Sequence, residues 1–217
     1  LGVLSLAGCA ITPPRDAAPA PTRAEPATVS CTYRTGGEPA RPVDPPDSGE
    51  VPATGTVTYL LALGDGIVSL ELDRSLAPCA VHSFEHLAAQ GWFTGTACHR
   101  LGTMGMFILQ CGDPTGTGLG GPGYSFDDEF GDDDPAPTTD YPAGTVVMAN
   151  SGPDANGSQF LLVYKDTTLD RRYTVFGHMD AASTQAVSDL AMQGHDSAFG
   201  DSGHPHGPAT IEAVSAG

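Results

Sequence analysis

The sequence predicts a mainly β protein, an antiparallel β-barrel capped by two α-helices. Between residues 55 and 214, several short apolar segments are separated by long loops rich in glycine, aspartate and proline. Only two segments, far apart in the chain, carry a helical pattern. Many short strands with few helices are typical of barrels and sandwiches.

Residues 55–73 are expected to form a β-hairpin. Val68, Leu70 and Leu72 alternate with polar residues, as in a strand with one buried face. A Gly-Asp-Gly sequence at residues 64–66 can form the tight turn. Further short strands are expected over residues 96–101, 107–111, 145–149, 159–163, 173–177 and 211–214.

Two helices are expected, over residues 78–90 and about 181–193. Pro78 suits a first helical position, and the apolar residues after it fall on one side of a helix. Asp180 is a suitable N-cap for the second helix. A glycine follows each segment and can end it.

The start of the chain has a different composition. Residues 6–9, Leu-Ala-Gly-Cys, look like a bacterial lipobox, which implies cleavage before Cys9 and lipidation of its thiol. The alternative is a hydrophobic end with a chance cysteine. The apolar run is shorter than the ~20 residues that span a bilayer. The basic flank of a signal peptide is missing, so we expect the sequence to be clipped at its start.

Residues 10–52 are rich in proline, alanine and threonine and have no apolar period. This composition favours an extended spacer, with the part after Ser30 pinned to the domain through Cys31. We therefore expect a signal-peptide remnant at residues 1–8, a linker at 9–52 and one folded domain at 53–217.

The net charge of −17, most of it after residue 50, limits the partners. Nucleic acid binding needs a basic face, and an anionic membrane surface repels an acidic domain. We expect no nucleic acid partner and membrane contact only through the lipid anchor, outside the cytoplasm.

Four sequence blocks occur in order: His99-Arg100, FILQCGDP at 107–114, MANSGPDANGSQF at 148–160 and TVFG at 174–177. Together they resemble the cyclophilin family of peptidyl-prolyl cis-trans isomerases, over roughly residues 56–214. The resemblance implies an eight-stranded antiparallel barrel with a helix at each end. It also implies an enzyme that isomerises X-Pro bonds without a cofactor or a metal.

Rotation about an X-Pro bond faces a barrier of ~18–20 kcal/mol because amide resonance is lost. A guanidinium can stabilise the lone pair that the prolyl nitrogen regains in the twisted state. The resemblance assigns this role to Arg100, although a lone arginine on a strand is ordinarily structural. It assigns contacts to the substrate backbone to Gln110 and Asn150, and places Tyr173 where many members have histidine.

The resemblance also implies a substrate-binding surface. Between Arg100 and Gln110 the chain has two residues more than the common members of the family. The local geometry of the site is therefore in question. Thr168 replaces a tryptophan that helps many members hold cyclosporin, so weak cyclosporin binding is expected. The residues implied to line the proline pocket, which on strands can equally be core, are Phe107, Ile108, Leu161 and Leu169, with Ala149 and Gln159 beside them.

Besides Cys9, the chain has four cysteines. An even number outside the cytoplasm favours two disulfides, and four cysteines allow three pairings. The resemblance puts Cys98 and Cys111 on neighbouring strands, which implies Cys98–Cys111 and leaves Cys31–Cys79. Zinc ligation is the alternative, but no C-x-x-C spacing occurs.

Several short motifs point to other chemistry. Gly-Asp-Ser-Gly at 200–203 copies part of a trypsin-like nucleophile motif, and with His99 it suggests a serine hydrolase. Too few residues follow Ser202 to wall a specificity pocket. His204 and His206 could bind a metal, and the acidic loop 127–134 calcium, but a turn and a solvated loop fit their spacing better. The glycine run at 116–121 lacks the Lys-Ser/Thr of a phosphate loop.

We expect a monomeric, surface-tethered prolyl isomerase that acts on proline-containing segments of exported proteins. The alternative from another class is a peptide-binding or scaffold module of the same fold with little turnover. Both readings share every binding residue.

Overall fold

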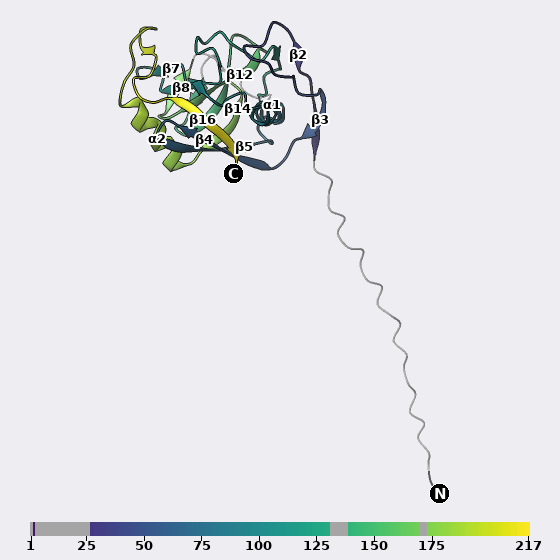
Figure 1. The fold of residues 1–217 in the computed structure, drawn as a ribbon. Helices are drawn as coiled ribbons and strands as arrows, with labels where there is room; N and C mark the ends of the chain where they lie inside the picture. Colours follow the sequence, from purple (N-terminus) through teal and green to yellow (C-terminus); the bar gives the residue numbers. More distant parts are fainter. Residues whose placement is uncertain (1, 3–26, 131–138, 170–172) are drawn as a thin grey trace.

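One curled antiparallel sheet organises the chain (Figure 1). The computed structural model describes residues 2, 27–130, 139–169 and 173–217. Within them, the expected mainly β fold with two helices is confirmed. The sheet has ten strands because two-residue strands, β6 and β15, join it. In sheet order the strands are β15 (Ser202–Gly203), β7 (Arg100–Gly102), β8 (Ile108–Cys111), β12 (Asn156–Val163), β11 (Thr145–Asn150), β14 (Val175–Met179), β5 (Gly66–Asp73), β4 (Thr56–Leu63), β16 (Thr210–Ala216) and β6 (Thr96–Ala97).

The hairpin of β4 and β5 forms as expected. Leu63 pairs with Gly66 at its closed end. Gly64 has a φ of 56°, which a residue with a side chain adopts only under strain. The alternating residues of β5 are buried, so this hairpin supplies one wall of the core.

The strand expected over residues 96–101 is divided into β6 and β7. The backbone N–H of Cys98 donates to the backbone carbonyl of Ala209. The N–H of the next residue, His99, donates to the backbone carbonyl of Gln110. The chain therefore changes partner between two residues. This change of partner places Arg100 at the start of β7, opposite β8.

Both expected helices are present. Helix α1 (Pro78–Ala89) packs against β12 and β14 through Phe84, whose ring contacts Phe160 and Phe176. Helix α2 (Ala181–Ala191) begins at Asp180, whose side chain accepts a hydrogen bond from the Ser183 N–H, as an N-cap does. It packs on β5 and β14. No helix in the described residues is long and apolar enough to cross a membrane.

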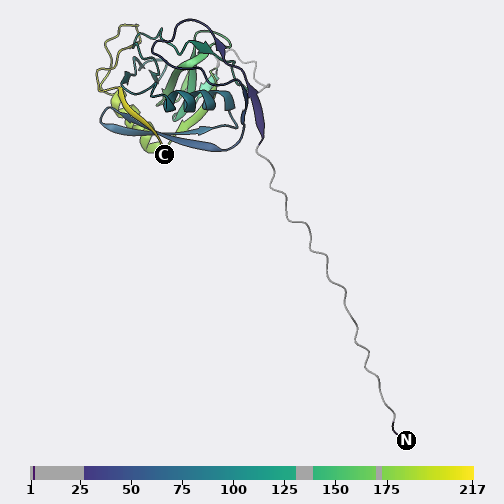
Figure 2. The same ribbon diagram turned by 45° about the vertical axis from the view of Figure 1, so that its right-hand side comes forward.

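Residues 27–52, here called the strap, lie along the edge of the domain (Figure 2). The sequence assigns this stretch to the linker. In the structure β1 (Thr28–Cys31) pairs with β3 (Gly49–Pro52). Strand β2 (Arg34–Thr35) pairs with β9 (Tyr124–Ser125). The Cys31–Cys79 disulfide ties the strap to α1, so the expected pinning after Ser30 is found. Cys9 and the lipobox lie outside the described residues.

Candidate functional site

The centre of the candidate site is the pairing of β7 with β8. Arg100 lies opposite Gln110, and Leu161 of β12 lies opposite Gln110 on its other side. Three residues that are distant in sequence thus stand side by side on adjacent strands. The Arg100 side chain is half-buried, and its Nε donates a hydrogen bond to Ser202 Oγ at 3.0 Å.

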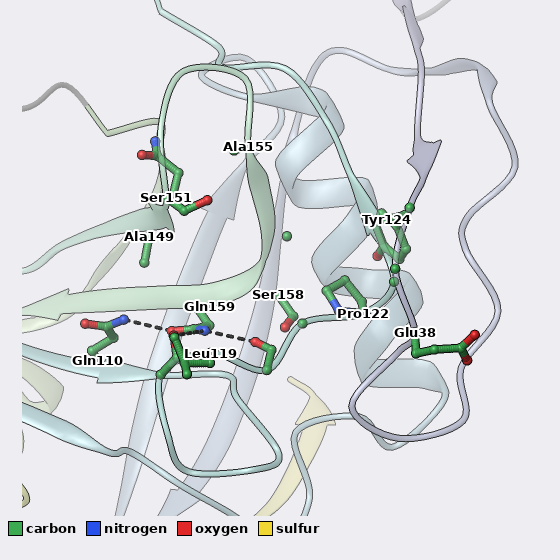
Figure 3. Close-up of a pocket in the computed structure, with 18 residues that line it drawn as sticks. Glu38, Gln110, Leu119, Pro122, Tyr124, Ala149, Ser151, Ala155, Ser158 and Gln159 are labelled. Carbon is green, nitrogen blue, oxygen red and sulfur yellow. Dashed lines mark hydrogen bonds between the residues drawn. The ribbon is translucent and has the colours of Figure 1, made fainter.

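A chain of amide hydrogen bonds fixes the two glutamines (Figure 3). Gln110 Nε2 donates to Gln159 Oε1 at 2.8 Å. Gln159 Nε2 donates in turn to the carbonyls of Gly118 and Gly120, at 3.0 and 2.9 Å. Because these carbonyls can only accept, the orientation of both amide groups is determined.

A cavity of about 430 Å³, here called the groove, opens beside these glutamines. On one side it is lined by Gln110, Gln159, Ala149 and Asn150. The Asn150 side chain is also held, since its Nδ2 donates to Asp128 Oδ1 at 3.3 Å. On the other side are glycines of the 118–123 loop and Gly36, Gly37 and Glu38 of the strap, with the Glu38 carboxylate directed away from the glutamines in Figure 3.

A buried apolar cluster, here called the apolar patch, includes Leu161, the residue that pairs with Gln110. Met106, Ala149, Tyr173 and Val175 are partly buried against it. The members of the patch are Ile108, Tyr141, Val147, Leu161, Val163 and Leu169. These six members are buried, so the partly buried side chains around them form the accessible surface of the patch, an apolar surface on which a pyrrolidine ring can rest.

The patch brings together most of the apolar residues implied by the sequence. Ile108 is 0% exposed and forms the floor of the patch, and its contact with substrate stays a prediction. The ring of Phe107 lies instead against Tyr164, with Lys165 Nζ 4.3 Å from its centre. Met106 packs on the patch. The two extra residues of this loop are the one sequence signal that could have indicated that Met106, and not Phe107, packs on the patch.

Tyr173 is held by Tyr141 across the patch. The Tyr173 N–H donates to the Tyr141 hydroxyl at 2.6 Å, and the same hydroxyl donates to the Tyr173 carbonyl at 3.3 Å. The ring of Tyr173 packs on the patch. The structure thus places Tyr173 beside the apolar residues, and its role as a catalytic side chain stays a prediction.

Asp113 organises the glycine loop that borders the groove. Its carboxylate accepts hydrogen bonds from the N–H groups of Thr115, Gly118 and Gly120, at 2.7, 2.7 and 3.1 Å. Burial alone would raise the pKa of Asp113, but these hydrogen bonds outweigh it and hold the pKa below its ordinary value. A buried anion therefore fixes the loop from inside.

Comparison with known proteins identifies the family. Residues 58–215 match the family model for cyclophilin type peptidyl-prolyl cis-trans isomerases. The chain belongs to the cyclophilin family. It is 43% identical over 196 residues to "Probable peptidyl-prolyl cis-trans isomerase B" of Mycobacterium leprae, and 41% identical to the protein of that name in Mycobacterium tuberculosis. These matches cover 86% of this chain but 66% and 63% of the two relatives, less than two thirds of their length.

Solved cyclophilin structures confirm the fold. A cyclophilin of Cryptosporidium parvum superposes with a TM-score of 0.62 at 29% identity. The superposition covers 75% of this chain and 98% of that one. The curled antiparallel sheet with two helices is therefore that of the family.

Both implied disulfides of this cyclophilin are formed. They are Cys31–Cys79 and Cys98–Cys111. The second bond lies directly before β7 and at the end of β8, so it brackets the Arg100–Gln110 pair. No group of three or more metal-binding side chains occurs among the described residues.

The serine hydrolase motif does not assemble in this cyclophilin. Ser202 Oγ accepts a hydrogen bond from Arg100. His99 is 4% exposed, and burial lowers its pKa below the ordinary value, with Asp113 opposing the shift. Within the described residues neither ring nitrogen of His99 has a hydrogen-bond partner, so the histidine is not placed to take a proton from Ser202.

The acidic loop is partly structural. Glu129 accepts hydrogen bonds from the N–H groups of Cys79 and Ala80 at the start of α1, at 2.9 and 2.8 Å. Asp128 accepts from Asn156 Nδ2 at 2.8 Å. These two carboxylates therefore stabilise the fold and do not only face solvent. Residues 132–134 lie outside the described residues.

Proposed function

We propose that this cyclophilin accelerates cis-trans isomerisation of X-Pro bonds and that Arg100 stabilises the twisted amide. The observation that carries the proposal is the β7–β8 pairing, which sets Arg100 beside Gln110. Gln110 lines the groove and pairs with Leu161 of the apolar patch. A cation, fixed amides and an apolar surface are the three elements that the reaction needs.

The proposed mechanism uses no bond to the substrate. The pyrrolidine ring rests on the apolar patch, while the amides of Gln110 and Asn150 hold the neighbouring backbone. As the amide twists, its nitrogen becomes a hydrogen-bond acceptor, and the Arg100 guanidinium donates to it. This interaction is stronger in the twisted state than in either planar isomer, so it lowers the barrier.

A relative's ligand supports the substrate class. The Cryptosporidium parvum cyclophilin structure determined in the presence of the dipeptide Ala-Pro superposes on this chain with a TM-score of 0.60. We infer that proline-containing peptides are the substrates here as well. The chain spans less than two thirds of its mycobacterial relatives, so the activity of the whole protein rests on the same proposal.

The test is isomerisation of an X-Pro peptide by the full chain, measured by exchange NMR, with Arg100→Ala beside the parent. The expected loss is about 100- to 1000-fold, the effect of removing one transition-state donor. Arg74→Ala is the matched control, because Arg74 pairs with Glu85 on α1. It also removes one positive charge, and it should keep the parental rate.

Two outcomes would change the assignment. An unchanged rate in folded Arg100→Ala removes Arg100 from the mechanism. A parent that binds the peptide without accelerating exchange favours the peptide-binding module instead. A melting curve for each variant shows that a lost rate does not reflect lost structure.

We further propose that the protein works outside the cytoplasm, on exported proteins, and is anchored by a lipid on Cys9. The lipobox at residues 6–9 and the two disulfides support this, since disulfides persist in oxidising compartments. Expression of the precursor in a bacterium with labelled palmitate should label the parent and not Cys9→Ser. Equal label in both would reject the anchor.

A further inference from the structure

Ser202 is the residue of the Gly-Asp-Ser-Gly motif that hydrolase chemistry leaves without a role. It lies on β15, which pairs with β7 so that Ser202 is opposite Gly102 and Gly203 is opposite Leu101. Ser202 is 1% exposed. The fold thus carries a hydroxyl from near the end of the chain to the strand that begins with Arg100.

The contact between the two side chains is specific. Arg100 Nε donates to Ser202 Oγ at 3.0 Å. A guanidinium is planar, and its five N–H groups have fixed relative directions. A hydrogen bond at Nε therefore sets the plane of the whole group and leaves the N–H groups of both terminal nitrogens for another acceptor.

The loop before β15 holds Ser202 in place. Asp196 Oδ1 accepts from the N–H groups of Ala198 and His204, at 3.0 and 2.8 Å. Asp196 Oδ2 lies 2.8 Å from His204 Nδ1. A Cβ on Gly203 would lie 2.6 and 2.9 Å from the backbone nitrogens of Ser197 and Ala198, closer than real Cβ atoms approach, so the loop would have to shift if any other residue followed Ser202. The hydroxyl is therefore presented by a fixed segment.

We propose that Ser202 is a positioning residue, which holds the Arg100 guanidinium in the orientation that meets the twisted amide. The proposal rests on the proposed role of Arg100. An arginine side chain has many rotamers, and one that is ordered before the substrate arrives loses less entropy in the transition state. Ser202 therefore acts on the rate through Arg100 and does not itself touch the substrate.

The test compares Ser202→Ala with the parent in the full chain. We expect kcat to fall about tenfold with KM unchanged, since a hydrogen bond to a charged group is lost and the binding surfaces stay intact. Ser183→Ala is the matched control. Ser183 is also a buried serine whose Oγ accepts a hydrogen bond, from the Ser69 N–H, but it lies on α2. This control should keep the parental kcat.

Two further measurements separate positioning from general stability. In an Arg100→Ala background, Ser202→Ala should cause no additional loss of rate. In ¹⁵N NMR, the Arg100 Nε–H signal should be protected from solvent exchange in the parent and exchange faster in Ser202→Ala.

The outcomes are distinguishable. An Arg100→Ala variant as fast as the parent removes the role of Arg100 and this proposal with it. If Arg100→Ala is slow but Ser202→Ala matches Ser183→Ala, only the positioning role is wrong. A rate loss from Ser202→Ala that persists in the Arg100→Ala background also overturns it.

Discussion

Removal of the Cys31–Cys79 disulfide should destabilise the protein more than removal of Cys98–Cys111. The first bond joins residues 48 apart, for which the chain-entropy relation gives about 4 kcal/mol. The second joins residues 13 apart and gives about 3 kcal/mol by the same relation. The perturbation is the double substitution Cys31→Ala with Cys79→Ala, and the matched control is the same change at Cys98 and Cys111.

Equilibrium unfolding in urea, without reductant, measures both effects on the full chain. We expect the free energy of unfolding to fall in both variants, by about 1 kcal/mol more when the longer loop is opened. Hydrogen exchange adds a local readout. The N–H groups of Gly36 and Ala40 donate to the carbonyls of Gly123 and Gly121. These two N–H groups should lose their protection from exchange only when Cys31–Cys79 is absent.

A larger loss of unfolding free energy in the Cys98/Cys111 variant would refute the reasoning, because loop length would then not determine how much each disulfide stabilises the fold. Retained protection at Gly36 and Ala40 would show that strand pairing alone holds the strap.

Three further outcomes are expected. In urea unfolding, Asp113→Asn should lower the free energy of unfolding more at pH 7 than at pH 2. A carboxylate whose pKa is lowered in the folded state stabilises the fold above about pH 4 and loses this contribution as pH falls through the folded pKa. Equal destabilisation at both pH values would contradict this. Gly36→Trp should raise KM for long peptides but not for a capped X-Pro dipeptide. A Cβ at Gly36 meets nothing within 4 Å, so the indole ring has room to enter the groove. Unchanged KM values for both substrates relative to the parent would show that peptides do not use the groove. Thr168→Trp should tighten cyclosporin binding in a fluorescence titration, because Thr168 is exposed beside Leu169 of the apolar patch; no gain would mean that this position does not face the ligand.

Local signals in the sequence were sufficient for much of the fold. The helix at Pro78 has its start, apolar stripe and terminal glycine within a few residues, so its bounds follow from the sequence. The N-cap at Asp180 is equally local. The glutamine and arginine of the site lie within recognisable blocks, and the strands carry them to neighbouring positions.

The remainder depends on contacts between distant residues. Strand β2 has two residues and no alternation, and it exists because β9 pairs with it. Met106 packs on the patch and the Phe107 ring lies against Tyr164, an arrangement of the loop that periodicity does not show. The hydrogen bond between Arg100 and Ser202 joins residues 102 apart, and nothing in either neighbourhood indicates it.

The strap determines where a shortened fragment of this protein can begin. The family match begins at residue 58, inside β4. A fragment begun at residue 53 keeps every strand of the main sheet but loses Cys31. Cys79 would then carry a free thiol in the first turn of α1. Such a fragment would be prone to oxidise into linked dimers. It would also lack the Gly36–Glu38 wall, so its substrate preferences would describe a different groove.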